Sequence, residues 1–403
     1  MGSTSLGKAF NRLWSASLSS NLADGILNTS VPLLAVTLTE SPVQISAITA
    51  LVMLPWLFFA IPIGALVDRV DRRMALVFAN CIRFLIGALL AITVSTHLIN
   101  MLWLYVFVFS MGICEVLVDT TAQAMIPKML EKENYERGNS RLAISENVIS
   151  QFVGSPISSA IFAIAIFIPF FITSAGYFIA ALFIFLIPAQ FHASMNKDED
   201  PNKGKDGFLA EIKFGINYLY NDKKILRLVL TTTALGFFFS MATATNVLFL
   251  IKVLHVKTSL FGAVMTVQAI GGITGAFLTP KLSQRFGRGK VLATAIVASS
   301  IPVFLIGFAT NIWNFLPLTV LIGFSISGWN ILLMSTYQHL IPNELFGRIH
   351  GTRRTLVWGM MPFGSLIGGV IATHGLRLPF IICGAIGSTI AILNFKFLKS
   401  LNV

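Results

Sequence analysis

The stretch GALVDRVDRRMAL, residues 64–76, places five charged side chains within six positions, between two long apolar runs. These charges are Asp68, Arg69, Asp71, Arg72 and Arg73. The flanking runs, 43–66 and 74–96, contain only one further charged residue, Arg83. A short charged segment between two apolar runs is typical of a loop between two membrane-spanning helices.

The composition of the whole chain supports a membrane protein. Of its 403 residues, 55% are hydrophobic and only 11% are charged, whereas about 25% are charged in a soluble domain. Its 34 Phe and 31 Gly suit helices packed in lipid. The three cysteines, Cys81, Cys114 and Cys383, are isolated in apolar runs, so we expect neither a disulfide framework nor a metal site.

Twelve apolar runs are long enough to span a bilayer, which requires about 20 residues per helix. They are 17–38, 43–66, 74–96, 101–122, 143–165, 168–188, 226–250, 259–280, 290–310, 313–336, 352–373 and 377–399. If all twelve cross the membrane, 25 of the 29 basic residues lie on the side of the N-terminus. The positive-inside rule then predicts that both termini are cytoplasmic. This asymmetry explains the net charge of +12 without nucleic-acid binding.

The chain also repeats itself, since VGSPISSAIFA (153–163) aligns with FGSLIGGVIAT (363–373) at an offset of 210 residues. An even number of spans separates the copies, so both face the same way. Parallel repeats around a central site are one transporter architecture. We therefore expect an all-α fold of two six-helix bundles, 1–190 and 226–403, joined by a cytoplasmic connection over 191–225 that contains an amphipathic helix.

The motif GALVDRVDRR resembles the signature of the loop between helices 2 and 3 in the major facilitator superfamily. LPWLFFAIPIGALVDRVDRR and EVLVDTTAQAMIPKML also resemble the bacterial exporters that include enterobactin and macrolide efflux proteins. Asp71 departs from the family pattern, which usually has Gly there. The resemblance implies a cytoplasmic latch in which Asp68 caps the start of helix 11 and Arg72 pairs with an acid near the cytoplasmic end of helix 4, where Asp119 lies. The expected latch residues are Gly64, Asp68, Arg69, Arg72, Arg73 and Asp119. The alternative is that these charges only anchor the topology.

Ionisable residues inside the predicted spans are rare and indicate function, because each costs roughly 2.5–3.5 kcal/mol to insert. Asp24, Arg83 and Glu115 lie at similar depths, and Glu115 shares a helix face with Asp119. Burial favours the neutral form of an acid, and a nearby arginine favours the charged form. We predict that Asp24 and Glu115 transfer protons and that Arg83 modulates them. A static ion pair is the alternative.

The second half contains no acid inside its spans. Its spans 226–250 and 313–336 contain hydroxyl and amide side chains among aromatic residues and Met. In the superfamily the corresponding helices 7 and 10 line the cavity, and such walls suit a bulky, largely apolar substrate. The substrate-cavity candidates are Phe238, Asn246, Trp329, Asn330 and Tyr337.

Superfamily antiporters have Gly-Pro followed by paired Gly on helix 5. Here the matching GSPISS has Gly154 and Pro156 but replaces later glycines by serine, and GSLIGG has Gly364 and Gly368 without the proline. Small residues allow close helix packing, so we assign these four to helix contacts. The serine substitutions weaken the prediction of antiport.

Together these features predict a monomeric secondary transporter of the bacterial inner membrane that uses a proton gradient, without cofactor or metal, to export amphipathic or apolar small molecules. No enzyme site or ATP-binding motif is evident. The alternatives are a proton-coupled uptake symporter and a membrane receptor or assembly factor that does not transport.

Overall fold

The computed structural model describes residues 6–67, 70–131, 134, 137, 138, 141, 142, 144–188 and 217–401, and within them all regular structure is helical. Asp68, Arg69 and the predicted connection from 191 to 216 lie outside these described residues. Eleven helices in the described part are long and apolar enough to cross a membrane. The expectation of an all-α membrane fold is therefore confirmed.

Each predicted apolar run coincides with one helix or one series of short helices. The first half contains α1 (Lys8–Leu38), α2 (Pro42–Val67), α3 (Arg72–Ser95), α4 (Met101–Met129), the π-helix η2 (Ile144–Gly154) that continues as α6 (Ser155–Ile164), and α7 (Ile168–Phe185). The second half contains α9 (Lys223–Thr243), α10 (Asn246–Leu248), η4 (Phe249–Val253), η5 (Thr258–Leu260), α11 (Phe261–Phe286), α12 (Arg288–Ile306), α13 (Ile312–Leu340), α14 (Asn343–Ala372) and α15 (Leu378–Lys399).

The helix α1 is the predicted span that is not among the eleven apolar helices. It is 31 residues long, so its length is sufficient. Its first half, however, contains polar residues at close intervals, from Ser17 through Asn21 to Asp24. Ser17 pairs with Ser145 of η2, Asp24 pairs with Arg83 of α3, and Asn21 donates to Ser17 within α1. These contacts explain how a polar helix lies within an apolar bundle.

The chain divides into two compact units. Unit 1 comprises Met1–Glu40, Leu54–Lys197 and Lys257–Thr266, and unit 2 comprises Ser41–Met53, Asp198–Val256 and Val267–Val403. Compared with the two predicted bundles, the first part of α2 belongs to unit 2, and the segment that begins α11 belongs to unit 1. The predicted boundaries at 190 and 225 stay a prediction.

Close backbone contacts explain the two exchanged helix starts. Within unit 1, a Cβ added to Gly262 would collide with the Ser155 carbonyl, and Ser159 Oγ donates a hydrogen bond to the Ser259 carbonyl at 3.1 Å. Within unit 2, a Cβ added to Gly369 would collide with Ser46 Oγ. The start of α11 thus packs closely against α6 in unit 1, and the start of α2 packs closely against α14 in unit 2.

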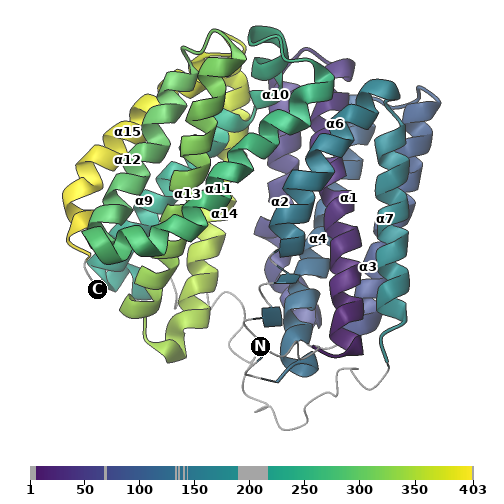
Figure 1. Ribbon diagram of the computed structural model, residues 1–403, viewed down its shortest axis with the longest axis horizontal. Helices are drawn as coiled ribbons and strands as arrows, with labels where there is room; N and C mark the ends of the chain where they lie inside the picture. Colours follow the sequence, from purple (N-terminus) through teal and green to yellow (C-terminus); the bar gives the residue numbers. More distant parts are fainter. Residues whose placement is uncertain are drawn as a thin grey trace. The chain divides into compact units, whose positions relative to one another are not determined.

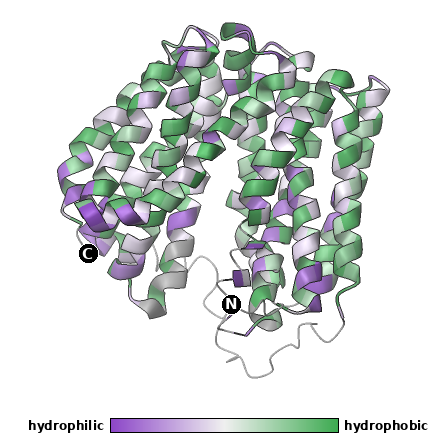
Figure 2. Ribbon diagram, viewed as in Figure 1, coloured by the Kyte–Doolittle hydropathy of each residue, from purple (hydrophilic) through white to green (hydrophobic). Residues whose placement is uncertain are grey.

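Within unit 1, α1 packs against α7 and η2, and α3 packs against α7 and α4 (Figure 1). The core where these helices meet contains buried apolar side chains such as Leu13, Leu76, Met125 and Ile184. Within unit 2, α12 packs against α15 and α13, and α9 packs against α14 and α15. Figure 2 shows apolar residues along most of the length of the helices in both units, as expected for helices that face lipid.

Equivalent glycines bring helices together in both halves of the repeat. A Cβ on Gly154 would lie 2.9 Å from Gly25 Cα on α1. A Cβ on Gly364, which is 210 residues later, would collide with the Phe237 carbonyl on α9. Gly364 therefore repeats on α14 and α9 the contact that Gly154 makes with α1.

Hydroxyl pairs accompany these glycines. In unit 1, Thr29 Oγ1 donates to Ser155 Oγ at 2.9 Å. In unit 2, Ser240 Oγ and Ser365 Oγ lie 2.6 Å apart. Ser155 and Ser365 are also 210 residues apart, so the internal repeat seen in the sequence is repeated in the contacts.

The other two residues assigned to helix contacts lie at the same two crossings. Pro156 occupies the first turn of α6, directly after the 11-residue π-helix η2. Because η2 runs directly into α6, the proline removes one intrahelical hydrogen bond where the π-helix changes to the α-helix. A Cβ on Gly368 would collide with the Met241 carbonyl of α9, so Gly368 continues the α14–α9 contact by one turn.

Candidate functional site

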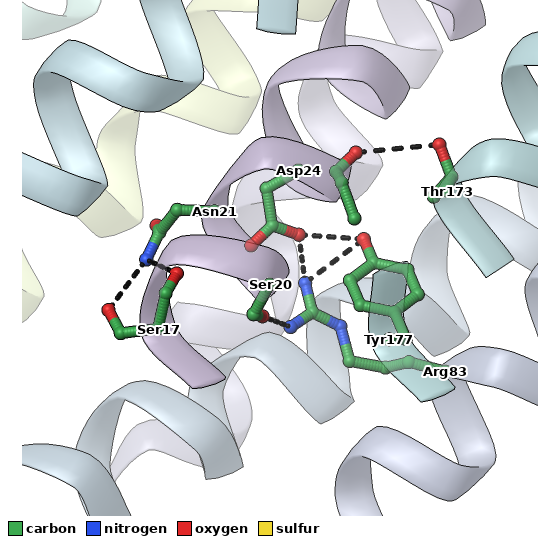
Figure 3. Close-up of polar contacts among 8 residues, drawn as sticks. Ser17, Ser20, Asn21, Asp24, Arg83, Thr173 and Tyr177 are labelled. Carbon is green, nitrogen blue, oxygen red and sulfur yellow. Dashed lines mark hydrogen bonds and ion pairs between the residues drawn. The ribbon is translucent and has the colours of Figure 1, made fainter. Parts of the chain in front are cut away.

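A buried polar network joins three helices of unit 1 (Figure 3). Arg83 on α3 forms an ion pair through Nη2 with Oδ1 of Asp24 on α1, and its Nη1 donates to Ser20 Oγ at 3.0 Å. Tyr177 on α7 donates to the same Asp24 Oδ1 at 2.7 Å. The Arg83 guanidinium also lies 4.1 Å from the centre of the Tyr177 ring. In Figure 3 the other Asp24 oxygen points away from both partners.

The two members of the ion pair differ in exposure. The Arg83 side chain is 2% exposed, whereas that of Asp24 is 16% exposed. A buried guanidinium that loses its partner leaves an uncompensated charge, which costs about 3–5 kcal/mol. Arg83 is therefore fixed in the protein interior, while the Asp24 side chain is partly exposed.

Glu115 on α4 is half-buried beside this network. Its charge interacts with those of Asp24, Arg83, Asp119 and Glu146. Among the described residues, Glu115 has no hydrogen bond or ion pair of its own. The structure thus brings together the three residues that were predicted to couple protons, with one acid bonded to the arginine and the other acid unbonded.

Unit 2 contains a pocket of about 320 Å³. It lies between α9, α12, α13, α14 and α15, and three of the substrate-cavity candidates, Phe238, Trp329 and Asn330, line it. None of the described residues on its wall is charged. The hydroxyls of Thr232 and Ser300 donate to carbonyls of their own helices, so the pocket presents mainly apolar surface with a few oxygen acceptors.

The other two substrate-cavity candidates lie elsewhere in unit 2. Tyr337 is completely buried in the apolar core, with the Arg353 guanidinium 4.5 Å from its ring centre. Asn246 is the first residue of α10, after α9 ends at Thr243. Its side-chain oxygen is buried and has no hydrogen-bond partner among the described residues. Neither residue lines the pocket.

A model of the major facilitator superfamily matches residues 13–361. The chain belongs to this superfamily. It is accordingly a multi-pass membrane protein of a transporter family, and the prediction of a superfamily member is confirmed. No curated protein sequence matches the chain.

Solved transporter structures share the superfamily fold. A variant of the nucleoside transporter NupG superposes with a TM-score of 0.77 at 14% identity, covering 98% of this chain and 99% of its own. A transporter of the POT family, solved with a thioalcohol-conjugated peptide, gives 0.76 at 12% identity, covering 98% and 96%. A bacterial homologue of the human lysosomal transporter Spinster gives 0.69 at 14% identity, covering 100% and 98%. At these identities the likeness establishes the fold alone.

The superfamily loop motif is visible in part. Arg72 Nη1 donates to the Ala124 carbonyl on α4 at 2.9 Å, five residues beyond the half-buried Asp119. Arg73 Nη2 donates to the Phe185 carbonyl at the end of α7, and its guanidinium lies 5.2 Å from the Phe185 ring centre. The two arginines therefore join the start of α3 to the ends of α4 and α7.

Two other positions of the motif have simpler functions in the structure. Asp71, where the superfamily pattern usually has Gly, is the N-cap of α3 and accepts hydrogen bonds from the backbone N–H groups of Arg73 and Met74 at 2.9 and 3.3 Å. Gly64 lies in α2, where an added Cβ would meet nothing within 4 Å. The predicted latch functions of Asp68 and Arg69 concern positions outside the described residues.

Sequence reasoning missed Tyr177 and Ser20. Both are neutral, so a search for ionisable side chains inside the spans does not find them. A tyrosine within an apolar run is a usable signal, because a buried phenolic hydroxyl needs a hydrogen-bond partner. Among the described residues there is no group of three or more His, Cys, Asp or Glu side chains placed to hold a metal ion.

Proposed function

We propose that the protein is a proton-coupled exporter of amphipathic or largely apolar small molecules. In this proposal the network of unit 1 binds and releases the proton, and the pocket of unit 2 binds the substrate. The cytoplasmic latch consists of Gly64, Asp68, Arg69, Arg72, Arg73 and Asp119. The observation that carries the proposal is the arrangement of Asp24 and Glu115 around the buried cation Arg83.

The charges of this cluster favour the uptake of one proton. Asp24, Glu115 and Arg83 have a formal net charge of −1, and the nearby acids Asp119 and Glu146 add to the negative charge around Glu115. Burial of net charge in a low-dielectric interior is unfavourable. In this proposal the cluster takes up a proton on one acid, and the acid that remains charged pairs with Arg83.

The position of the proton then determines which helices are joined. When Asp24 is charged, Arg83 and Tyr177 bind it, which ties α1 to α3 and α7. When Asp24 is neutral, its attraction to Arg83 is lost, and Glu115 on α4 becomes the acid that attracts the guanidinium. Protonation thus moves an interhelical contact from α1 to α4, which is the kind of discrete change that biases an equilibrium between two conformations.

The pocket of unit 2 supports an apolar substrate. Its volume of about 320 Å³ is at the lower end of the 300–1,000 Å³ range of ligand sites, so it fits a ring system rather than a whole macrolide. Aromatic side chains such as Phe238 and Trp329 offer contact area, and Asn330 is exposed and forms no hydrogen bond within the described residues. We propose that the pocket binds the apolar part of the substrate and that Asn330 forms a hydrogen bond with its polar part.

Transport assays in inside-out membrane vesicles test this proposal. A panel of fluorescent amphipathic compounds is offered to vesicles that contain the protein, with an imposed pH gradient, acidic inside. An exporter accumulates a compound in the vesicle lumen, and a proton uncoupler abolishes the accumulation. An uptake symporter instead accumulates a compound only in right-side-out vesicles, and a receptor or assembly factor accumulates none in either orientation.

A further inference from the structure

We infer that a groove between α9 and α15 binds the phosphate head group of an anionic phospholipid. The groove has a volume of about 350 Å³ and is independent of the proton network and the apolar pocket. It lies at the start of α9 and near the end of α15, the side that the charge distribution predicts to be cytoplasmic.

The groove changes from charged to apolar along its length. On α9, Lys223 and Arg227 are one turn apart and line its outer end, while Leu230 and Ala234 continue the same stripe deeper into the membrane. On α15, Asn394 lies opposite Arg227, and Ile390 lies one turn further in. The stripe from residue 223 to 234 is ~16 Å long, about half of the bilayer's hydrocarbon core. This change from charged to apolar lining matches a phospholipid, with the head group at the cations and an acyl chain along the apolar part.

The Arg227 guanidinium is fixed in a position that leaves it available to a ligand. Its Nε donates to Asn394 Oδ1 at 2.9 Å, and its centre lies 4.5 Å from the centre of the Phe397 ring. Within the described residues, its Nη groups and the Lys223 ammonium have no hydrogen-bond partner. A planar guanidinium held on one edge can bind a phosphate with the other.

Among the described residues, the acid beside the groove does not neutralise these cations. Asp222 is the N-cap of α9, and its Oδ1 accepts hydrogen bonds from the backbone N–H groups of Lys224 and Ile225 at 2.9 and 3.0 Å. With Lys224 included, the first turns of α9 retain a net positive charge. This charge favours an anionic lipid over a zwitterionic one, since basic clusters at the ends of spanning helices attract anionic head groups.

Native mass spectrometry of the purified protein tests the inference. The protein in detergent is mixed with equal amounts of phosphatidylglycerol and phosphatidylcholine, and the lipid retained is counted. We expect preferential retention of phosphatidylglycerol, a reduction of about tenfold in the variant Lys223→Gln/Arg227→Gln, and no competition from millimolar glycerol phosphate, because the acyl chain contributes to binding. Equal retention of the two lipids would overturn the inference.

The matched control is Lys396→Gln/Lys399→Gln, which removes two exposed cations from the last turn of α15 outside the groove. We expect this variant to retain phosphatidylglycerol like the unmodified protein, and an equal loss in both variants would show nonspecific attraction instead. The charged connection from 191 to 216, which has five acids, Asp198, Glu199, Asp200, Asp206 and Glu211, beside four lysines, is the other candidate occupant. Binding of phosphatidylglycerol only after these acids are neutralised would contradict the inference.

Discussion

The Tyr177 hydroxyl donates a hydrogen bond of 2.7 Å to Asp24 Oδ1, the same oxygen that forms the ion pair with Arg83. Tyr177 on α7 and Asp24 on α1 thus join two helices at a group whose charge can change. The bond requires that Asp24 accept, and a charged carboxylate is the stronger acceptor. In the proposed mechanism, protonation of Asp24 therefore weakens the contact between α1 and α7 at this level.

The variant Tyr177→Phe tests the function of this hydrogen bond. The ring remains beside Arg83, so helix packing should be retained, but the bond to Asp24 is lost. A hydrogen bond to a charged group contributes about 1.5–3 kcal/mol, so we expect proton-driven transport to fall about tenfold or more. The control is Tyr218→Phe at a partly buried tyrosine outside the network. Equal transport by the unmodified protein and Tyr177→Phe would show that the hydroxyl is dispensable.

Two glycines within helices predict opposite effects of the same substitution, because only one of them lies at a helix contact. Gly364→Ala should destabilise the protein by about 1–3 kcal/mol, because its Cβ would collide with the Phe237 carbonyl. Gly64→Ala should be neutral or stabilising by about 0.5–1 kcal/mol, because its Cβ lies in open space within a helix. Thermal unfolding in detergent measures both. A destabilised Gly64→Ala variant would show that Gly64 has a contact that the structure does not contain.

Filling the pocket of unit 2 should reduce substrate binding in proportion to the volume added. A Cβ on Gly387 would lie 3.5 Å from Ser300 Oγ, an ordinary contact, so Gly387→Ala should bind substrate almost normally. Gly387→Leu extends into the pocket and should weaken binding at least tenfold. Substrate titration by fluorescence quenching measures the effect, and thermal stability serves as the folding control. Unchanged affinity in a stable Gly387→Leu variant would exclude the pocket as the substrate site.

The contact of Arg72 with α4 predicts a transport defect without an insertion defect. Arg72→Gln removes the charged donor to the Ala124 carbonyl, and we expect transport to fall several-fold while the amount of protein in the membrane stays the same. Lys281→Gln is the control, because Lys281 is an exposed cation near the end of α11. Loss of protein from the membrane in Arg72→Gln alone would indicate that Arg72 serves folding and not the latch.

The sequence was sufficient to place the helices and to bring Asp24, Arg83 and Glu115 together. Apolar length determines a membrane span almost directly, because lipid forces the backbone to satisfy its own hydrogen bonds. Charged residues inside the spans are so few that their depth in the membrane was enough to predict which of them lie near one another. The glycine and serine repeat at an offset of 210 residues likewise predicted contacts that the structure contains in both halves.

Other features depend on tertiary packing and could not be predicted in the same way. The direction in which Tyr337 points, into the core and not the pocket, is set by the rotation of α13. Two predicted runs are not continuous α-helices in the structure. One is broken between α9 and α10, and the other begins as the π-helix η2, and the length of an apolar run predicts neither feature. The exchange of the starts of α2 and α11 between the two units arises from contacts between residues far apart in the sequence.

The most direct test of the proton mechanism compares two transport modes in one double variant, Asp24→Asn/Glu115→Gln. Reconstituted vesicles are assayed for transport driven by a pH gradient and for substrate exchange across the membrane without a gradient. Substrate exchange serves as the control for folding, because Asp24→Asn leaves the buried Arg83 without its charged partner. Glu115→Gln alone is a second test variant, and it breaks no bond among the described residues. We predict that the double variant keeps exchange and loses at least nine-tenths of gradient-driven transport. Gradient-driven transport at the unmodified rate would contradict the mechanism.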